Sequence, residues 1–279
     1  MIDLHTHSTA SDGTDEPGQV VEAAARAGLT VVALTDHDTS VGWADAARAS
    51  SSTGVALVRG AEISTTDAGI SVHLLAYLYD PEHPALVREL ERTRTSRLSR
   101  LERMAALLAE DYPITWEDVV AQTGLGATVG RPHLADALAA AGVVASRDEA
   151  FATMLRPGAR YYVPHDAPGT LEAVRAVRAA GGVPVVAHPG ASERGRVIPD
   201  ATIERLAEAG LAGLEIDHRD HDAATRLRLR ELARSLDLLV TGSSDYHGVG
   251  KPNLIGENTT APEALEAIEA QGRLEVLYP

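Results

Sequence analysis

The stretch Asp3-Leu4-His5-Thr6-His7-Ser8 decides how the rest of this sequence is interpreted. His5 and His7 are two positions apart, and side chains at this spacing on a β-strand lie on one face. Both imidazoles can then point into the space above the strand end, with Asp12 on the loop that follows. Taken alone, the alternation is also typical of a polar strand face. It predicts a metal site only if other ligands converge on it.

Later apolar runs also end in an imidazole or a carboxylate. Residues 31–34 precede His37, residues 55–58 precede Glu62, Val72 precedes His73, residues 183–187 precede His188, and residues 238–241 precede Asp245 and His247. An isolated residue of this kind is usually a helix cap or a hydrogen-bonded side chain. Its recurrence at successive strand ends predicts that these side chains meet at one end of a barrel or sheet.

Composition narrows the chemistry. The chain has 279 residues, 44% hydrophobic and 23% charged, which is typical of a soluble globular protein with one large α/β domain or a barrel carrying an insertion. It has no Cys, so histidine and carboxylate are the available metal ligands, and these suit Mn, Fe, Zn or Mg. No apolar run is long enough for a membrane span and no leader is visible, so a cytoplasmic location is expected.

The formal net charge is -15. This charge disfavours binding of duplex nucleic acid, which is itself a polyanion. A small anionic substrate remains compatible, because bound divalent cations would reverse the local charge.

The hydrophobic pattern divides the chain into a barrel and an insertion. Strands and helices alternate over residues 1–80 and again over 169–279, where a last strand is expected at 274–277, and parallel strands are predicted. Residues 81–168 are instead helical, with a long helix over 85–110 and shorter ones over 115–122, 132–141 and 146–155. We therefore expect one α/β barrel domain interrupted by a helical insertion that covers the site.

Six motifs occur in order along the chain: HTHS (5–8), TDH (35–37), GAEIS (60–64), VH (72–73), AHPG (187–190) and SDYH (244–247). Together they resemble the polymerase-and-histidinol-phosphatase (PHP) superfamily of metal-dependent phosphoesterases. The resemblance spans nearly the whole chain and implies a distorted (β/α)7 TIM-like barrel. It also implies two or three divalent ions, Mn first among them, bound by His5, His7, Asp12, His37, Glu62, His73, His188, Asp245 and His247.

Counting supports more than one ion, because these residues exceed the roughly four to six ligands that a single ion takes. Two cations about 3.5 to 4 Å apart can activate water and neutralise a phosphoryl group under attack. Activated water is the expected nucleophile, since the chain has neither Cys nor a Gly-x-Ser-x-Gly motif. Asp3, Asp36 and Asp38 adjoin the ligands and are expected either to orient them or to form caps and turns.

The insertion contains Gly130-Arg131-Pro132-His133, and this segment, with the chain length and motif spacing, resembles the branch that hydrolyses nucleoside 3',5'-bisphosphates to 5'-nucleotides. Some members of that branch also trim short RNA from the 5' end. Pro132 suits the first position of a helix, so Arg131 and His133 are expected to bind a substrate phosphate at the helix N-terminus. The alternative is that Arg131 pairs with a surface acid such as Asp136.

His218 lies after the predicted strand 214–217 and is expected to contact the substrate or assist catalysis together with Asp245, a structural role being the alternative for His218. Asp217 stands where the resembled branch is expected to have an aromatic residue, which leaves base preference open. No role is expected for three other histidines: His83 and His165 are expected in exposed loops, and His221 is expected on a surface helix.

Three other functions stay open. A histidinol-phosphatase-like enzyme would share the metal site, and a non-catalytic PHP module would use metal for stability alone. An amidohydrolase acting on a C–N bond commonly needs a bridging lysine at a strand end, whereas Lys251, the only lysine, lies in a loop. The expected partners are a small phosphorylated nucleotide and short single-stranded RNA, and the oligomeric state is left open.

Overall fold

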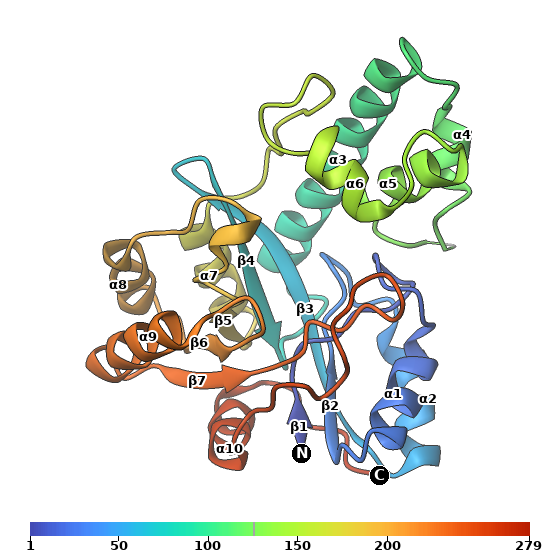
Figure 1. Ribbon diagram of the computed structural model, residues 1–279. Coiled ribbons are helices and arrows are strands. Elements are labelled where there is room, and N and C mark those ends of the chain that lie inside the picture. Colours follow the sequence, from blue (N-terminus) through green and yellow to red (C-terminus); the bar gives the residue numbers. More distant parts are fainter. Residues whose placement is uncertain (125) are drawn as a thin grey trace.

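A seven-stranded sheet curls into a distorted barrel at the centre of the molecule (Figure 1). The computed structural model describes residues 1–124 and 126–279. The strands run in sequence order: β1 (Ile2–Asp3), β2 (Val31–Leu34), β3 (Ala56–Asp67), β4 (Ile70–Tyr77), β5 (Val183–Val186), β6 (Gly213–Asp217) and β7 (Leu239–Gly242). The expected α/β barrel is confirmed.

The expectation of parallel strands throughout is wrong for β4. It pairs antiparallel with both β3 and β5, while the other neighbouring strands are parallel. Ala68 and Gly69 connect β3 to β4 and both have positive φ, 46° and 74°. Two such residues form the turn that suits a tight hairpin, so no crossover helix is needed. The Asp67-Ala68-Gly69 sequence was the available signal.

The two ends of the sheet meet next to β1. The His7 amide donates to the Tyr246 carbonyl at 2.8 Å, and the Thr260 amide donates to the Ile2 carbonyl at 2.9 Å. These bonds join the segment after β1 to the segment after β7, so the barrel is nearly closed. The strand expected at 274–277 is wrong: Leu277 makes only a single bridge, to Leu57.

In the part of the chain that the structure describes, six helices cover the outside of the barrel. They are α1 (Pro17–Arg26), α2 (Trp43–Thr53), α7 (Thr170–Ala179), α8 (Asp200–Glu208), α9 (Ala223–Ser235) and α10 (Pro262–Gln271). Alternate residues of each strand serve different layers. Val31 and Ala33 of β2 point into the barrel, whereas Val32 and Leu34 pack under the helices.

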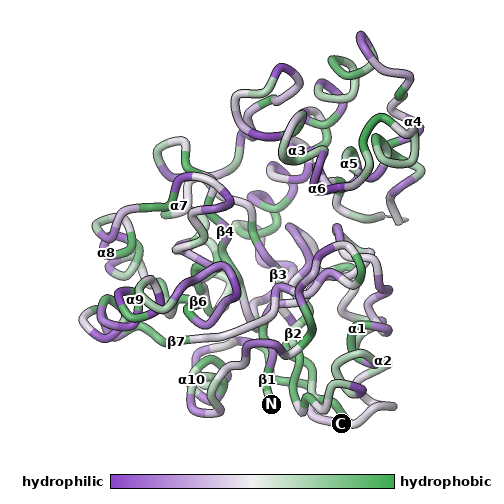
Figure 2. Tube along the Cα trace, viewed as in Figure 1, coloured by the Kyte–Doolittle hydropathy of each residue, from purple (hydrophilic) through white to green (hydrophobic). Residues whose placement is uncertain are grey.

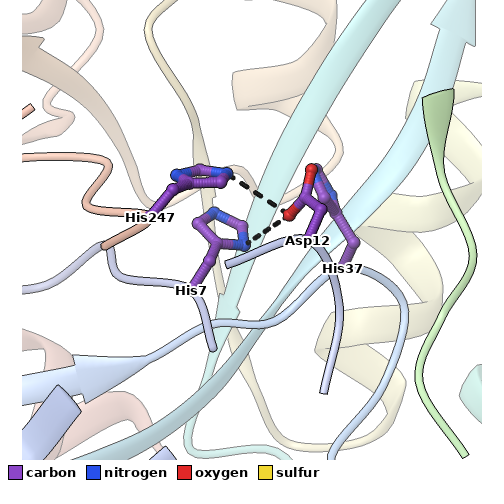
Figure 3. A group of neighbouring side chains, drawn as sticks. All are labelled: His7, Asp12, His37 and His247. Carbon is purple, nitrogen blue, oxygen red and sulfur yellow. Dashed lines mark ion pairs between the residues drawn. The ribbon is translucent and has the colours of Figure 1, made fainter. Parts of the chain in front are cut away.

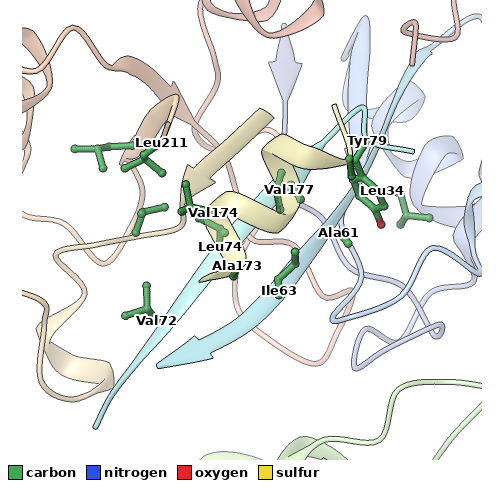
Figure 4. Packing of buried hydrophobic residues seen from close by; sticks show 14 of the residues in the cluster. Leu34, Ala61, Ile63, Val72, Leu74, Tyr79, Ala173, Val174, Val177 and Leu211 are labelled. Atoms are coloured by element: carbon green, nitrogen blue, oxygen red, sulfur yellow. The ribbon is translucent and has the colours of Figure 1, made fainter. Parts of the chain in front are cut away.

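The layer under the helices is continuous around β3 and β4. Figure 4 shows Ala173, Val174 and Val177 of α7 lying over Leu74 and Ile63. The hydrophobic stretches follow the barrel strands in Figure 2, whereas hydrophilic residues gather where the barrel faces the insertion. The apolar interior therefore ends before the strand ends that face the insertion, and polar side chains occupy that end.

The insertion has a core of its own. It contains α3 (Pro84–Ala109), α4 (Trp116–Val120), α5 (Arg131–Ala140) and α6 (Arg147–Thr153), and it lies beyond the ends of the barrel strands in Figure 1. Leu101, Met104, Leu134 and Leu138 belong to an apolar cluster separate from those of the barrel. A backbone bond of 2.9 Å from Thr128 to Ala10 ties the insertion to the loop after β1.

Across the described residues, no helix is long and apolar enough to cross a membrane.

Truncation of the layer under α7 should destabilise the protein. Leu74 is fully buried, so Leu74→Ala removes apolar contacts and leaves a cavity. We expect a loss of about 2 to 5 kcal/mol in the free energy of unfolding, measured by urea denaturation. The matched control is Leu227→Ala, whose parent side chain is 61% exposed. A Leu74→Ala midpoint equal to that of the control would contradict this packing.

Candidate metal centre

Glu62 is the centre of the polar end of the barrel. It lies on β3, and His73 lies on the same face of the antiparallel neighbour β4, because Glu62 pairs with Leu75 and Ser64 pairs with His73. The reversed direction of β4 brings the beginning of that strand to the end where the parallel strands finish. The His73 Nδ1 to Glu62 Oε1 distance is 2.7 Å.

The loops after β1 and β5 bring three further imidazoles to the same carboxylate. His5 Nε2 and His7 Nε2 lie 3.2 and 3.0 Å from Glu62 Oε2. His188 Nε2 lies 3.3 Å from Glu62 Oε1. The segment after β7 adds Asp245, whose Oδ1 lies 3.5 Å from both His5 Nε2 and His7 Nε2.

A second group surrounds Asp12. Figure 3 shows His7, His37 and His247 around its carboxylate, with ion pairs drawn from His7 and His247. The His247 Nε2 to Asp12 Oδ1 distance is 3.3 Å, and the His37 Nε2 to Asp12 Oδ2 distance is 3.8 Å. All nine sequence-predicted ligands therefore lie in one connected cluster.

The donor set fits more than one divalent ion. The cluster contains three groups in which the ligand atoms, one from each residue, all lie within 4.8 Å of one another. The groups are His7, Asp12, His37 and His247; His5, His7, Glu62 and Asp245; and His37, Glu62 and His73. Glu62, His7 and His37 each belong to two groups, so the groups adjoin. Bridging by Glu62 is compatible with this arrangement.

Buried ring nitrogens give an independent test of that fit. His37 Nδ1, His73 Nδ1 and His247 Nε2 are buried and have no hydrogen-bond partner among residues 1–124 and 126–279. A buried polar atom without a partner is costly. Each of these nitrogens nevertheless faces a carboxylate oxygen, at 3.4, 2.7 and 3.3 Å respectively. Coordination of a shared cation would satisfy both atoms.

The electrostatics of the cluster show strong mutual stabilisation of opposite charges. Burial alone would lower the pKa of His7, but hydrogen bonds to Asp245 and Glu62 raise it to about 9. Burial would likewise raise the pKa of Glu62, yet His73, His37 and His5 hold it well below its usual range. Protons on imidazoles thus compensate the carboxylates without metal, and metal ions would replace those protons.

Glu215 is a functional residue that the sequence analysis missed. Its Oε1 accepts from His5 Nδ1 at 2.9 Å, and its Oε2 accepts from the His188 amide at 2.9 Å. One fully buried carboxylate therefore orients two candidate ligands. The available signal was an acidic residue between Leu214 and Ile216, in the middle of an apolar strand.

The three aspartates next to the ligands hold backbone and hydroxyl groups rather than imidazoles. Asp36 accepts from the Ser8 amide and from Ser11 Oγ, both at 2.7 Å. Asp3 accepts from the Ser244 amide at 3.1 Å. Asp38 accepts from the Ser64 amide at 2.8 Å and forms an ion pair with Arg97 Nε at 2.7 Å. They fix the loops that carry the ligands, and Arg97 links α3 to one of those loops.

Arg131 and His133 both lie in the first turn of α5. The alternative pairing of Arg131 with Asp136 is wrong, because Asp136 binds Arg147 and Arg131 Nη1 donates to the Leu155 carbonyl at 3.1 Å. His133 is buried, and its Nδ1 accepts from the Gly130 amide at 3.0 Å. Burial lowers the pKa of His133, although nearby Asp12 and Asp136 act to raise it.

His221 and His165 lie in surroundings that differ from those expected from the sequence, and Asp217 contacts a helix. His221 is not a surface residue: its Nε2 accepts from the Gly190 amide at 3.0 Å and its Nδ1 bonds the Ile216 carbonyl at 2.8 Å. His165 is half-buried, and burial with nearby Arg97 and Arg100 lowers its pKa to about 3. Asp217 faces Arg230, with an Oδ1 to Nη2 distance of 2.6 Å, so it points to α9.

His218 is fully buried beside Asp245. Its Nε2 lies 3.8 Å from Asp245 Oδ2 and has no hydrogen-bond partner in the described chain, residues 1–124 and 126–279. Its other nitrogen, Nδ1, accepts from the Asp220 amide at 3.1 Å. In the neutral ring the proton therefore lies on Nε2, which faces the cluster.

Glu215→Gln should weaken metal binding without unfolding the protein. The amide keeps the shape of the side chain but removes its charge and one of the two acceptors that His5 and the His188 amide use. Loss of such an orienting partner typically costs about 10- to 100-fold in metal affinity. The measurement is Mn affinity by competition with a fluorescent chelator. The control is Glu208→Gln, at the end of α8. An unchanged Mn affinity would show that Glu215 does not orient the ligands.

Comparison with known proteins agrees with this geometry. Residues 3–114 match the family model described as PHP domain. The 3',5'-nucleoside bisphosphate phosphatase of Chromobacterium violaceum is 31% identical over 280 residues, covering 100% of this chain and 98% of the relative. A phosphoribosyl 1,2-cyclic phosphate 1,2-diphosphodiesterase of Eggerthella lenta is 35% identical, covering 88% and 94%. A 5'-3' exoribonuclease of Haemophilus influenzae is 30% identical, covering 88% and 89%.

The fold is shared as well. A crystal structure from Bifidobacterium adolescentis, described as a candidate metal-dependent phosphoesterase, is 44% identical and superposes with a TM-score of 0.95, covering 97% of this chain and 96% of that one. The similarity therefore runs along the barrel and the insertion alike. With its histidines and carboxylates gathered at the strand ends, this chain belongs to the PHP family of metal-dependent phosphoesterases.

Proposed function

We propose that this chain hydrolyses the 3'-phosphate of a nucleoside 3',5'-bisphosphate, giving a 5'-nucleotide and phosphate. The observation that carries the proposal is a cluster of arginines in the insertion, next to the metal centre. Arg100 and Arg131 lie over the ring of Tyr162, with their guanidinium carbons 5.1 and 5.8 Å from its centroid. Arg97 lies close enough to act on the pKa of both other arginines.

Only Arg97 among these three has an acidic partner. Within residues 1–124 and 126–279, no carboxylate forms an ion pair with Arg100 or Arg131, and each donates instead to a carbonyl, that of Val163 or Leu155. Burial, with Arg131 and Arg97 nearby, lowers the pKa of Arg100 to about 9. Uncompensated, partly buried guanidinium groups favour a bound anion, and their planar donors suit phosphate oxygens.

The cluster adjoins the metal centre through Arg97. The Arg97 side chain binds Asp38 and Ser64, which lie close to His37 and Glu62 in the sequence. Its Nη1 also lies close to Gly130, the residue before α5. Two cationic regions therefore lie side by side: the metal centre for the phosphoryl group that is cleaved, and the arginines for a second phosphate. A bisphosphate uses both regions, whereas a histidinol-phosphatase-like substrate has one phosphate and would leave one region empty.

Residues of the chain have distinct proposed roles in binding and hydrolysis. Divalent ions, when bound, lower the pKa of water and neutralise phosphoryl charge. Arg131 and His133 would hold the second phosphate, and the dipole of the α5 N-terminus would favour its negative charge. His218 offers an Nε2 proton toward the cluster, and Asp245 belongs to the ligand set. Mn is our choice of ion among those that a mixed set of histidines and carboxylates suits, because carboxylate ligands favour it and the family resemblance implies it.

Short single-stranded RNA is a further proposed substrate. An RNA carries a 5'-phosphate and a phosphodiester on its first nucleotide, the same spacing of groups as the bisphosphate. The resemblance to a 5'-3' exoribonuclease supports this extension. We expect no duplex binding, because the net charge of -15 opposes it.

Metal removal should abolish hydrolysis. We expect chelation to eliminate phosphate release and Mn to restore it, with elemental analysis giving at least two ions per active chain. Asp245→Asn should lower metal content and rate together, because the residue loses a ligand charge. Full activity with fewer than two ions would contradict the multinuclear site. A stable, metal-loaded chain without phosphatase activity would support the non-catalytic alternative.

Arg131→Ala should discriminate between substrates. We expect kcat/KM on a nucleoside 3',5'-bisphosphate to fall by about ten- to a hundredfold, the loss of about 1.5 to 3 kcal/mol of a charge-assisted contact, while a simple aryl phosphate is nearly unaffected. Arg131→Lys should recover part of the loss by retaining the charge. The control is Arg160→Ala, whose side chain is 62% exposed on the same insertion. Equal losses on both substrates would place Arg131 at the cleaved phosphate, and no loss would remove it from the site.

A further inference from the structure

Two cations that the sequence analysis did not assign converge on Asp245. Arg194 belongs to a 3-10 turn after β5 (Ser192–Arg194), and its Nη2 donates to Asp245 Oδ2 at 2.8 Å. Lys251 comes from the loop after β7, and its Nζ donates to the same oxygen at 3.0 Å. His218 Nε2 lies 3.8 Å from this oxygen as well.

The two oxygens of Asp245 face different surroundings. Oδ1 lies 3.5 Å from His5 Nε2 and His7 Nε2 and 3.4 Å from His247 Nδ1, so it faces the candidate ligands. Oδ2 faces Arg194, Lys251 and His218 instead. Asp245 therefore borders both the metal centre and a group of nitrogen donors, and Arg194 Nη1 also lies 3.2 Å from the candidate ligand His188.

The donors exceed what one carboxylate oxygen can accept. An ionised carboxylate offers about four lone-pair sites on its two oxygens, roughly two for each. Arg194 and Lys251 occupy these sites on Oδ2, and His218 Nε2 has no hydrogen-bond partner in residues 1–124 and 126–279. Asp220 also pairs with Arg194, whereas Lys251 and the Nε2–H of His218 face the negative charge of Asp245. Metal ions bound to Asp245 would withdraw that charge and leave the donors still less satisfied.

Asp220 holds two of these donors in place. Its Oδ2 accepts from Arg194 Nε at 2.6 Å, which leaves the terminal nitrogens of the guanidinium facing Asp245 and His188, the latter at 3.2 Å. Its amide donates to His218 Nδ1 at 3.1 Å. Arg194 and Lys251 keep 33% and 31% of their side-chain surface exposed, so a ligand can reach them.

We propose that Arg194 and Lys251, with His218, bind the non-bridging oxygens of the phosphoryl group that is cleaved at the metal centre. A phosphoryl group offers three such oxygens and negative charge, which matches the three donors in number and sign. The inference rests on the phosphoryl site of the proposed function but not on the nucleotide part of the substrate. It makes these residues contacts to the reacting group, whereas Arg131 contacts the phosphate that is retained.

The test separates phosphate binding from metal binding in the full chain. In Mn-loaded protein, Arg194→Ala and Lys251→Ala should each weaken inorganic phosphate binding by about ten- to a hundredfold in calorimetry. Mn affinity should stay equal or increase, because each variant removes a positive charge near the ions. Arg194→Lys and Lys251→Arg should recover part of the phosphate affinity. The control is Arg196→Ala, an exposed residue of the same loop that donates to the Gly69 carbonyl.

Two outcomes would overturn the proposal. A parallel loss of Mn and phosphate affinity would show that the cations only anchor Asp245, and unchanged phosphate affinity would remove them from the site. A third outcome separates this inference from the proposed substrate. If the variants bind phosphate more weakly but the wild type does not cleave a bisphosphate, the proposed substrate is wrong and the inference about Arg194 and Lys251 is still supported.

A second measurement needs no substitution. Lys251 is the only lysine, so acetylation of its amine can be followed by peptide mass spectrometry in the wild-type protein. Inorganic phosphate should slow this acetylation in the Mn-loaded chain. An acetylation rate independent of phosphate would contradict contact between Lys251 and the phosphoryl group.

Discussion

The carboxylate of Glu62 lies within 3.4 Å of ring nitrogens of five histidines, and the rest of the site depends on this contact. A buried charge is stable only when it is compensated. Protonated imidazoles can supply the compensation, as the raised pKa of His7, about 9, indicates, and divalent ions can supply it instead. The buried carboxylate at the strand ends therefore requires positive charge nearby. Positive charge is also what stabilises a bound phosphoryl group, which is negatively charged.

The candidate ligands were predictable because each follows or lies on a strand, and strand ends in a barrel converge. The helix boundaries were largely predictable because apolar periodicity is a local property of the sequence. For example, α10 spans Pro262–Gln271 as expected. The direction of β4 was not predicted, because alternating strands and helices favour parallel strands. The short turn sequence Ala68-Gly69, which indicates a hairpin, was not taken into account. The reversal matters for the site, because it brings His73, near the beginning of β4, to the strand ends where Glu62 lies.

Residues that act through distant partners could not be found in this way. Glu215 and His5 are 210 positions apart, and nothing local in either segment indicates their contact. Arg194 and Lys251 lie in loops, whose conformation depends on what they pack against. The burial of His221 and His165 was missed for the same reason. Local patterns thus show which residues can bind a metal, whereas the groups that orient them and hold the substrate appear only with the assembled barrel.

The contact between α3 and Asp38 has a consequence for how such enzymes can diverge. Arg97 forms an ion pair with Asp38, and Arg94 donates to the Asp38 carbonyl at 2.7 Å, while Asp38 itself is fully buried beside His37. Removing the partner of a buried charge costs about 3 to 5 kcal/mol, so swinging the insertion away would be expensive. The insertion is fixed by these contacts to the loop that carries His37. A recombinant barrel carrying a foreign insertion would inherit new substrate contacts only if the incoming helix also carried an arginine for Asp38.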